Sequence, residues 1–468
     1  MNIIEKQLPL KTVRHGIGFL LATIICCWLP QESPAAWQAG VARKAITPSE
    51  PIWMAGYASR DKPATGKLTE LWAKVLVLRD DDGQQAALIS LDLIGIDRAL
   101  SQSICNQLSR RYGLRREQIA ICCSHTHTGP VVAKNLRPMH FEMLTAKQQQ
   151  QIDGYADYLE QTIVSLVGQS IADLRQVDLF WGEGRANFAV NRRNNPEQDV
   201  PRLRTENQLV GPVDHAVPVL SIRDGEQQKA IVFGYACHAT VLSSYEWSGD
   251  YPGFAQIEIE AAYPNCVAMF WAGCGADQNP LPRRSVELAK EYGTTLAKSV
   301  ISAVNGPLSK VAGKLETTYE EIDLPFDELP TEKELEDEAT SKNRYLAARA
   351  RTLLQNMRQG HPLPQTYPYP IAHWKLGDQV RFVLLGGEVV VDFAIKTKTR
   401  FPGAWIAGYT NDVMAYIPSK RVWLEGGYEG AGAMMYYGLP TRWHSSVEDV
   451  IHAEIDRQLK DATPKQKP

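Results

Sequence analysis

The sequence has no excess of charge of either sign. Its 468 residues include 50 lysines and arginines and 53 aspartates and glutamates, which leaves a formal net charge of -3. A balance so close to neutral gives no reason to expect nucleic acid or an anionic membrane as a partner. With 44% hydrophobic residues, the composition is that of a globular protein long enough for one large core or two modest ones.

The sequence also lacks any C-x-x-C pair, which argues against a cysteine-rich zinc site. Of its eight cysteines, six lie beyond residue 36, inside expected core elements and without the spacing of a disulfide framework. We therefore expect most of them to be small buried side chains. Export would permit a disulfide, but the sequence does not say which cysteines would pair.

Long apolar runs are absent except near the N-terminus. There a basic segment at residues 6–15 precedes an apolar run at 16–29, and small residues follow at 33–36. This order is typical of a cleaved secretory leader, and the run is short for a membrane span. We predict a signal peptide over residues 1–36, a mature chain from about Trp37, and a secreted or periplasmic location, with an uncleaved anchor as the alternative. The mature protein is expected to contact a membrane at most peripherally.

Strand and helix patterns alternate along the rest of the chain. Hairpins are expected at residues 73–93 and 217–236, and buried strands at 118–123, 266–271, 380–386 and 405–410. Apolar residues at helical spacing predict helices at 98–112, 147–174, 285–304, 389–399 and 445–459, and a charged surface helix at 331–359. The pattern predicts an α/β fold in which one mixed-sheet domain carries a helical excursion.

The most informative stretch is CSHTHTGP, at residues 123–130. It follows the strand expected at 118–123, and its Gly-Pro pair breaks regular structure. Residues i and i+2 of a strand share a face, so His125 and His127 would aim at one point if the strand extended that far. Zinc readily accepts imidazole, the commonest metal ligand in proteins. Two polar loop histidines without a metal are the alternative.

Three further polar residues occur at similar places. His238 and Glu388 each follow an expected strand, and Tyr416 lies in a later loop. Histidines and one carboxylate that leave a coordination position open would form a catalytic zinc site, at which the pKa of water falls toward ~7. Each residue also has a simpler explanation: a core histidine with satisfied hydrogen bonds, a carboxylate paired with Arg381, and a packed aromatic ring.

Several short motifs follow one another along the chain. They are GVARKAITP at 40–48 with MAGY at 54–57, HTHTGP at 125–130, Asn191-Arg192, CHAT at 237–240, and NDVMAY at 411–416 followed by YEGA at 428–431. In this order they resemble the N-terminal catalytic domain of the neutral ceramidase family. The resemblance spans nearly the whole expected mature chain. It implies one neutral-ceramidase-like catalytic domain over residues 37–468, with a helical insertion at about 326–366.

The resemblance further implies a zinc amidase site. By motif position, the zinc ligands would be His125, His238, Glu388 and Tyr416. The residues that line the reacting centre would be His127, Arg192 and Tyr428. Arg192 would supply a fixed positive charge to a substrate carbonyl or to the developing oxyanion.

The chain departs from the family pattern in two places. Its turn after the strand at 266–271 reads ADQNP at 276–280, where the family has Gly-Asp-Val-Ser-Pro, so Asn279 stands in place of the catalytic serine. An amide cannot replace a serine as nucleophile, but it can donate a hydrogen bond to an oxyanion. The family's C-terminal immunoglobulin-like domain is also expected to be missing, which weakens the case for a membrane-embedded sphingolipid.

We therefore expect a zinc-dependent hydrolase that cleaves the amide bond of an N-acylsphingosine-like substrate with a metal-activated water. The candidate proton carriers are His127 and Asp277, and the candidate stabilisers of developing charge are Arg192, Tyr428 and Asn279. The expected partner is a small-molecule or lipid amide, and the oligomeric state is left open.

Two alternatives to this function remain. The protein could hydrolyse another amide or ester, or it could be a metal-holding binding protein without turnover. The shape of the pocket would discriminate between substrates, since a deep apolar tunnel favours a lipid and a shallow polar cleft favours a soluble or cell-envelope amide.

Overall fold

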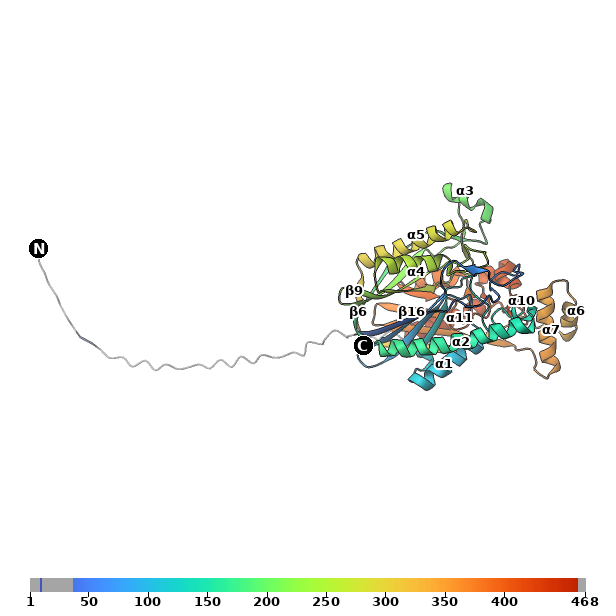
Figure 1. Cartoon of the computed structure of the whole chain (residues 1–468), viewed down its shortest axis with the longest axis horizontal. Helices are drawn as coiled ribbons and strands as arrows, with labels where there is room; N and C mark the ends of the chain where they lie inside the picture. The colour runs from blue at the N-terminus through green and yellow to red at the C-terminus, as the bar shows by residue number, and fades with distance from the viewer. Residues whose placement is uncertain (1–8, 11–36, 462–468) are drawn as a thin grey trace. The chain divides into compact units, whose positions relative to one another are not determined.

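A mixed sheet of nine strands forms the centre of the protein (Figure 1). In spatial order its strands are β11 (Val267–Ala272), β9 (Gln227–Tyr235), β8 (Ala216–Asp224), β6 (Arg175–Arg185), β1 (Trp37–Ala45), β3 (Trp72–Arg79), β4 (Gln85–Leu91) and β5 (Ile119–Cys123), and β13 (Ser309–Val311) pairs with β6. A second sheet contains, in order, β14 (Leu315–Pro325), β15 (Thr366–Leu376), β16 (Val380–Leu385) and β18 (Ala404–Ala407). The predicted α/β mixed-sheet fold is confirmed, together with both hairpins.

The computed structural model describes residues 9–10 and 37–461. Residues 37–461 belong to one compact unit. Apart from residues 9–10, the predicted leader at 1–36 lies outside the described residues, so the signal peptide stays a prediction.

An arrangement of hairpin, helix and parallel strand occurs three times. Strands β3 and β4 are antiparallel, α1 (Arg98–Tyr112) follows, and β5 returns parallel to β4. The same order is found in β8, β9, α4 (Asp250–Ala262) and β11, and again in β15, β16, α8 (Val391–Arg400) and β18. Parallel neighbours require such a crossover, because a tight turn can join only antiparallel strands. The three units matter for function because His125, His238 and Glu388 follow β5, β9 and β16, one strand from each.

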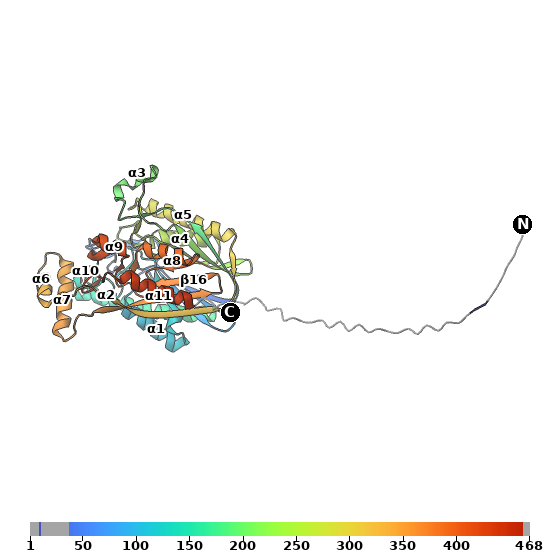
Figure 2. The same ribbon diagram turned by 180° about the vertical axis from the view of Figure 1, so that it is seen from behind.

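Two pairs of helices flank the main sheet (Figure 1). Helices α1 and α2 (Ala146–Ala172) lie on one side, and α4 and α5 (Val286–Asn305) lie on the other. The long helix α2 starts at a capping box, in which the side chains of Thr145 and Gln148 each accept from the other's backbone N–H. From behind, α8 and α11 (Val447–Asp461) lie over the second sheet (Figure 2).

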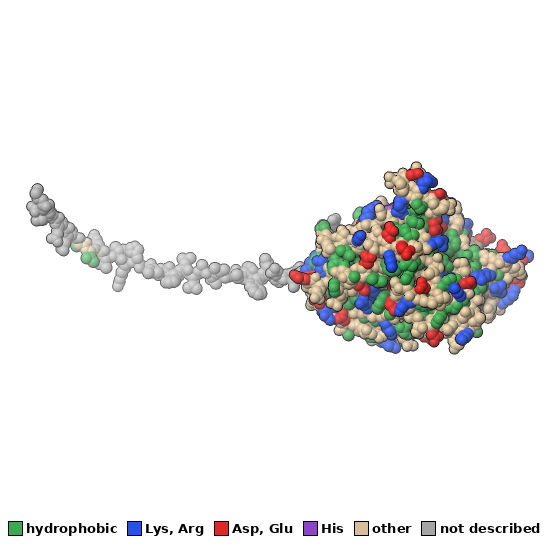
Figure 3. Space-filling model, turned by 45° about the horizontal axis from the view of Figure 1, so that its top comes forward, with side chains coloured by type: hydrophobic (Ala, Val, Ile, Leu, Met, Phe, Trp, Pro, Cys, Tyr) green, Lys and Arg blue, Asp and Glu red, His purple; other side chains and the backbone are tan. Residues whose placement is uncertain are grey.

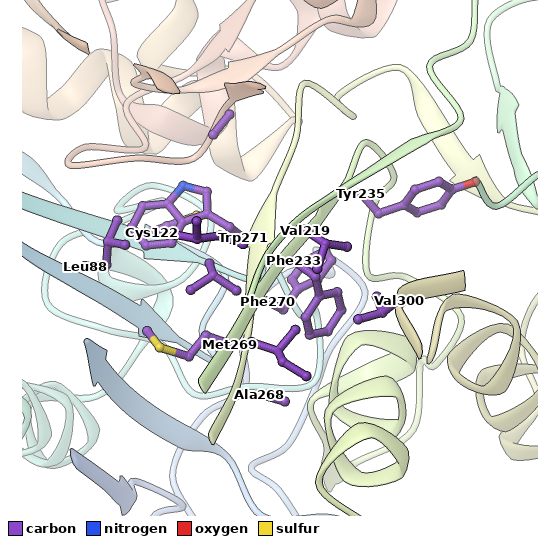
Figure 4. Close-up of a cluster of buried hydrophobic side chains, with 14 of the residues drawn as sticks. Leu88, Cys122, Val219, Phe233, Tyr235, Ala268, Met269, Phe270, Trp271 and Val300 are labelled. Carbon is purple, nitrogen blue, oxygen red and sulfur yellow. The ribbon is translucent and has the colours of Figure 1, made fainter. Parts of the chain in front are cut away.

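The hydrophobic core contains side chains from both ends of the nine-stranded sheet (Figure 4). Leu88 of β4 and Cys122 of β5 are buried in one cluster with Phe233 of β9 and Phe270 of β11. Ser90 of β4 donates a hydrogen bond of 2.7 Å to the carbonyl of Phe270, so β4 and β11 lie against each other. The loops that follow β5 and β9 are therefore held close together by close-packed side chains.

The charged excursion contains two helices where the sequence predicts one. Helix α6 (Glu332–Ala339) ends before Asn343, and α7 (Arg344–Arg358) begins after it. The Asn343 side chain accepts from the N–H groups of Tyr345 and Leu346, which makes it the N-cap of a new helix. This local hydrogen bonding outweighs the helical periodicity that runs through the segment.

Within residues 9–10 and 37–461, no helix combines the length and apolarity needed to cross a membrane. On the face seen in Figure 3, acidic and basic side chains are interspersed over the compact unit.

Candidate metal centre

His125 and His127 lie in the loop after β5 and not in the strand itself. Strand β5 ends at Cys123, and His125 has a φ of 60°, a left-handed conformation that interrupts the extended chain. The strand therefore does not extend as far as His127, and a shared strand face does not explain how the two rings align. The rings nevertheless meet, with Nε2 of His125 3.1 Å from Nε2 of His127.

Backbone pairing between two loops brings His238 to the same place. Thr126 forms a parallel bridge with Ala239, and the N–H of His127 donates to the Ala239 carbonyl at 3.2 Å. The Arg60 side chain supports the first loop by donating to the His127 carbonyl at 2.7 Å. The loops after β5 and β9 thus form one rigid support for three imidazoles.

Each of the three rings has its Nδ1 atom against a backbone carbonyl. The pairs are His125 with Ile94 at 2.7 Å, His127 with Gly56 at 3.0 Å, and His238 with Gly275 at 2.9 Å. A carbonyl can only accept, so each Nδ1 carries a hydrogen and each Nε2 is the ring atom available to a metal ion. The ligand atoms of the three histidines all lie within 4.8 Å of one another.

Two of these carbonyls belong to glycines that the close packing requires. Gly56 has a φ of 100°, and a Cβ there would lie 2.6 Å from the His127 ring. A Cβ at Gly275 would lie 2.4 Å from the backbone nitrogen of Cys237. Any larger residue would push the carbonyl away from the ring that it orients.

Glu388 presents a carboxylate to the same point. Its Oε2 lies 3.1 Å from Nε2 of His125 and 3.2 Å from Nε2 of His238, and it has no hydrogen-bond partner among the described residues. Tyr437 donates to the other oxygen, Oε1. Glu388 therefore faces the histidines and Tyr437 instead of Arg381. These three buried atoms lie close together without hydrogen bonds among them. They fit a divalent metal ion, since imidazole nitrogen and carboxylate oxygen are atoms that zinc binds.

Burial and mutual proximity control ionisation in the cluster. Burial lowers the pKa of His238 to about 4, and the neighbouring Arg192 acts in the same direction. Burial, with His125 and His238, holds the pKa of His127 well below its usual 6.5. Burial alone would raise the pKa of Glu388, but His125 and His238 together hold it well below its usual range. At neutral pH His127 and His238 are neutral and Glu388 is charged, which are the forms that bind metals.

Tyr416 lies beside the cluster because of strand pairing. Strand β19 (Tyr416–Ile417) runs parallel to β17 (Glu388–Val389), with Tyr416 directly opposite Glu388. The Tyr416 hydroxyl is 3.2 Å from Nε2 of His238 and accepts a hydrogen bond of 3.1 Å from Nη2 of Arg192. Burial and the charge of Glu388 raise the pKa of Tyr416 well above 10, while Arg192 acts to lower it. The hydroxyl lies with the other predicted ligands, and its bond to a metal stays a prediction.

A second strand pair places Arg192 beside Asn279. Strand β7 (Ala189–Asn191) is antiparallel to β12 (Gln278–Pro280), and Arg192 follows β7. Nη1 of Arg192 donates to Oδ1 of Asn279 at 3.3 Å, and Nε donates to Glu429 at 2.7 Å. With Tyr428, these residues line a cleft of about 410 Å³. Because the amide oxygen of Asn279 faces Arg192, its NH₂ group is left to donate to a ligand.

Asp277 has a different environment from the other predicted residues. Its carboxylate accepts from the N–H of Val391 at 2.9 Å and from Asn191 at 3.0 Å, and it lies 3.5 Å from Arg421. Burial raises its pKa to about 6. These contacts tie β7, β12 and α8 together, and none of them reaches the histidine cluster. The predicted proton-carrying role of Asp277 stays a prediction.

Two residues of the site were not predicted from the sequence. Glu429 lies inside the YEGA motif, so its place next to Tyr428 was an available signal. Tyr437, at the end of α10 (Met434–Tyr437), had none, because only the fold shows that its hydroxyl reaches Glu388.

The fold and the site together define a class of protein. A mixed α/β fold that gathers three imidazoles, a carboxylate, a tyrosine and an arginine beside a cleft has the components of a catalytic metal centre of hydrolytic type. Comparison with known families classifies the chain more closely. Residues 37–272, half of the chain, match the family profile described as neutral/alkaline non-lysosomal ceramidase, N-terminal. The chain belongs to this family of hydrolases.

Curated relatives are similar over parts of the chain. Neutral ceramidase of Drosophila melanogaster is 29% identical over 117 residues, which are 24% of this chain and 16% of that protein. Neutral ceramidase 1 of Arabidopsis thaliana is 25% identical over 261 residues, which are 52% of this chain and 32% of that protein. The matched regions thus span a third or less of these relatives.

Solved structures extend the likeness in fold to nearly the whole chain. The crystal structure of neutral ceramidase from Pseudomonas aeruginosa superposes with a TM-score of 0.70 at 18% identity, covering 93% of this chain and 76% of the other. A structure described as ceramidase complexed with C2 superposes with a TM-score of 0.68 at 16% identity, covering 90% of this chain and 76% of the other. At such identities the likeness establishes the fold alone.

Proposed function

We propose that the protein is a metal-dependent amide hydrolase, with zinc as the metal. The observation that carries this proposal is the convergence of Nε2 of His125 and His238 with Oε2 of Glu388, the Nδ1 atoms of both rings being fixed by carbonyls. Tyr416 would complete the ligand set. A divalent ion held there would activate water for attack on an amide carbonyl.

The other residues of the site would divide the remaining work. Nε2 of His127 would take the proton from the attacking water, since this ring is neutral and, unlike His125 and His238, is only partly buried. Burial would lower the pKa of Arg192, but Tyr416 and Glu429 raise it well above its usual value, so its positive charge is permanent. That charge would stabilise the oxyanion, with Asn279 Nδ2 and the Tyr428 hydroxyl as further donors.

The reaction would consume one water. The amide C–N bond breaks, the carbonyl carbon gains the hydroxyl as a carboxylic acid, and the nitrogen leaves as an amine after receiving a proton from His127. Asn279 supplies no nucleophile, and attack by water needs none from the protein.

The polarity of the cleft favours one of the alternatives over a long-chain lipid. Apart from Leu281 and Tyr428, the residues that line it are charged or amides. A ceramide would have to bury long apolar chains against these polar walls, whereas a soluble amide or ester has little apolar surface to bury. The compartment we propose is the cell exterior or periplasm, because of the leader-like segment at residues 1–36.

Metal analysis combined with a substrate panel tests the proposal. The purified protein should contain about one zinc per chain and hydrolyse at least one member of a panel of short-chain ceramide, simple N-acetyl amides and esters. Removal of the metal by a chelator should abolish this hydrolysis, and added zinc should restore it. A metal-loaded protein that hydrolyses none of the panel would instead favour the binding-protein alternative.

A further inference from the structure

The cleft beside the metal donors carries recognition chemistry of its own. Its volume of about 410 Å³ is typical of a small-molecule site. The charged residues of its lining are Arg192, Arg193, Arg283, Glu197 and Glu429. Three arginines face two glutamates, so the lining has one positive charge in excess.

Three of the four carboxylate oxygens in the cleft already accept hydrogen bonds from arginines. Glu429 accepts from Arg192 with one oxygen, at 2.7 Å, and from Arg193 with the other. Oε2 of Glu197 accepts from both Nε and Nη2 of Arg283, at 3.1 and 2.9 Å. A ligand group that only donates hydrogen bonds would therefore compete with an arginine at each of these three oxygens.

The donor atoms of the cleft, by contrast, outnumber their partners. Nη1 of Arg283 and Nδ2 of Asn279 donate no hydrogen bond within the described part of the chain. The hydrogen bonds of these two side chains use Nε and Nη2 of Arg283 and Oδ1 of Asn279. Arg192 uses one N–H on each of its three nitrogens, which leaves two of its five. The cleft thus offers N–H groups to an acceptor.

These free donors lie at two separated points. Asn279, Leu281 and Arg283 all line the cleft, with Asn279 in β12 and the other two in the segment that follows this strand. At about 3.3 Å per residue, the Cα atoms of Asn279 and Arg283 are at most ~13 Å apart. A carbonyl held at Asn279 would therefore have Arg283 within reach of a group a few bonds further along the substrate.

We propose that the substrate is an amide that carries an anionic group, which Arg283 binds while the scissile carbonyl lies at Arg192 and Asn279. This inference rests on the hydrolase function proposed above. A guanidinium binds a carboxylate or a phosphate through two parallel hydrogen bonds. A neutral lipid amide would cover the same N–H groups and leave them without acceptors, which is unfavourable.

Matched substrate pairs test the inference separately from the function. The metal-loaded protein is assayed on N-acetyl amino acids and their neutral methylamides, and on N-acetylethanolamine with and without a phosphate. Hydrolysis of any of them supports the hydrolase function, whereas the ratio of kcat/KM within a pair reports on the anion. We expect kcat/KM to be at least about 10-fold higher for the anionic member of one pair. The pair that shows this ratio identifies carboxylate or phosphate as the anion.

The variant Arg283→Gln should lower the ratio of kcat/KM for the anionic member to that for the neutral member about 10- to 100-fold. This is the effect of losing a hydrogen bond to a charged group. The matched control is Arg202→Gln, which also removes an arginine paired with a glutamate, here Glu206, but from a position that is 57% exposed and outside the cleft. The control should keep the ratio of the unmodified protein. Equal rates within both pairs, or an unchanged ratio in Arg283→Gln, would overturn the inference.

If no substrate is hydrolysed, binding still decides the question. Calorimetry with an N-acetyl amino acid and with the phosphate analogue should detect binding of at least one to the metal-loaded protein, and Arg283→Gln should lose it. Absence of binding of both would overturn the inference independently of the hydrolase function.

Discussion

Tyr437 offers a specific test of the metal centre, because its hydroxyl donates a hydrogen bond to Glu388. Burial and the charge of Glu388 raise the pKa of Tyr437 well above 10, so its hydroxyl stays protonated and donates to Oε1. We predict that Tyr437→Phe, which deletes this one hydroxyl, weakens metal binding without preventing folding.

The magnitude follows from the bond that is lost. A hydrogen bond to a charged group contributes about 1.5–3 kcal/mol, and about 1.4 kcal/mol corresponds to a tenfold change in Kd. Oε1 of Glu388 would remain buried with no other donor, so the carboxylate would be less well oriented toward the histidines. We therefore expect the Kd for zinc to rise about 10- to 100-fold, the range typical of residues that orient metal ligands.

The assay is competition for zinc with a chromophoric chelator, alongside circular dichroism to verify the fold. The matched control is Tyr436→Phe, one residue earlier, whose ring packs against Tyr345 and Tyr428 and whose hydroxyl forms no hydrogen bond within residues 37–461. The control should bind zinc as the unmodified protein does. Equal Kd values for both variants would refute the reasoning that Tyr437 orients a metal-binding carboxylate.

Three further predictions concern ligands, charge and pH. His238→Ala should lose metal and activity together, whereas Arg192→Ala should keep the metal and lower turnover. The measurement is the amount of bound zinc per chain in each variant. Full zinc occupancy in His238→Ala would reject His238 as a ligand. Asn279→Ser should raise cleavage of short-chain ceramide and Asn279→Ala should lower activity on the native substrate by ~10²–10³; if no rate changes, Asn279 lies outside the site. Burial raises the pKa of Asp412 from 3.8 to about 7, so between these values the folded protein keeps a proton that the unfolded chain releases, and stability falls as pH rises. Between about pH 5 and about pH 8, the free energy of unfolding measured with urea should fall about 3 kcal/mol less in Asp412→Asn than in the unmodified protein. An identical dependence on pH in both proteins would contradict the raised pKa of Asp412.

The order of elements could be predicted because each has a local signal. The hairpins at β3–β4 and β8–β9 carry turn residues between apolar runs, and α1, α2 and α5 carry an apolar stripe at helical spacing. The break between α6 and α7 was missed because it depends on the Asn343 side chain, which competes with an otherwise continuous helical pattern.

The site could be predicted only in its residues and not in its geometry. His125 and His127 converge through a left-handed residue and a bridge to Ala239, and neither feature is encoded in an alternating pattern. The Tyr437–Glu388 and Arg192–Glu429 contacts join segments 49 and 237 residues apart, so no periodicity can reveal them. The order of the motifs predicted Tyr416 as a ligand. The pairing of β17 with β19 explains physically why its side chain lies next to Glu388.

The most direct test of the account is an anomalous difference map, collected at the zinc absorption edge, from crystals of the zinc-loaded protein. We predict a single strong peak ~2.0–2.2 Å from Nε2 of His125, Nε2 of His238 and Oε2 of Glu388. A peak bound elsewhere on the chain, or full occupancy of another site with none at these three atoms, would contradict the central claim that the three ββαβ units converge on one metal ion.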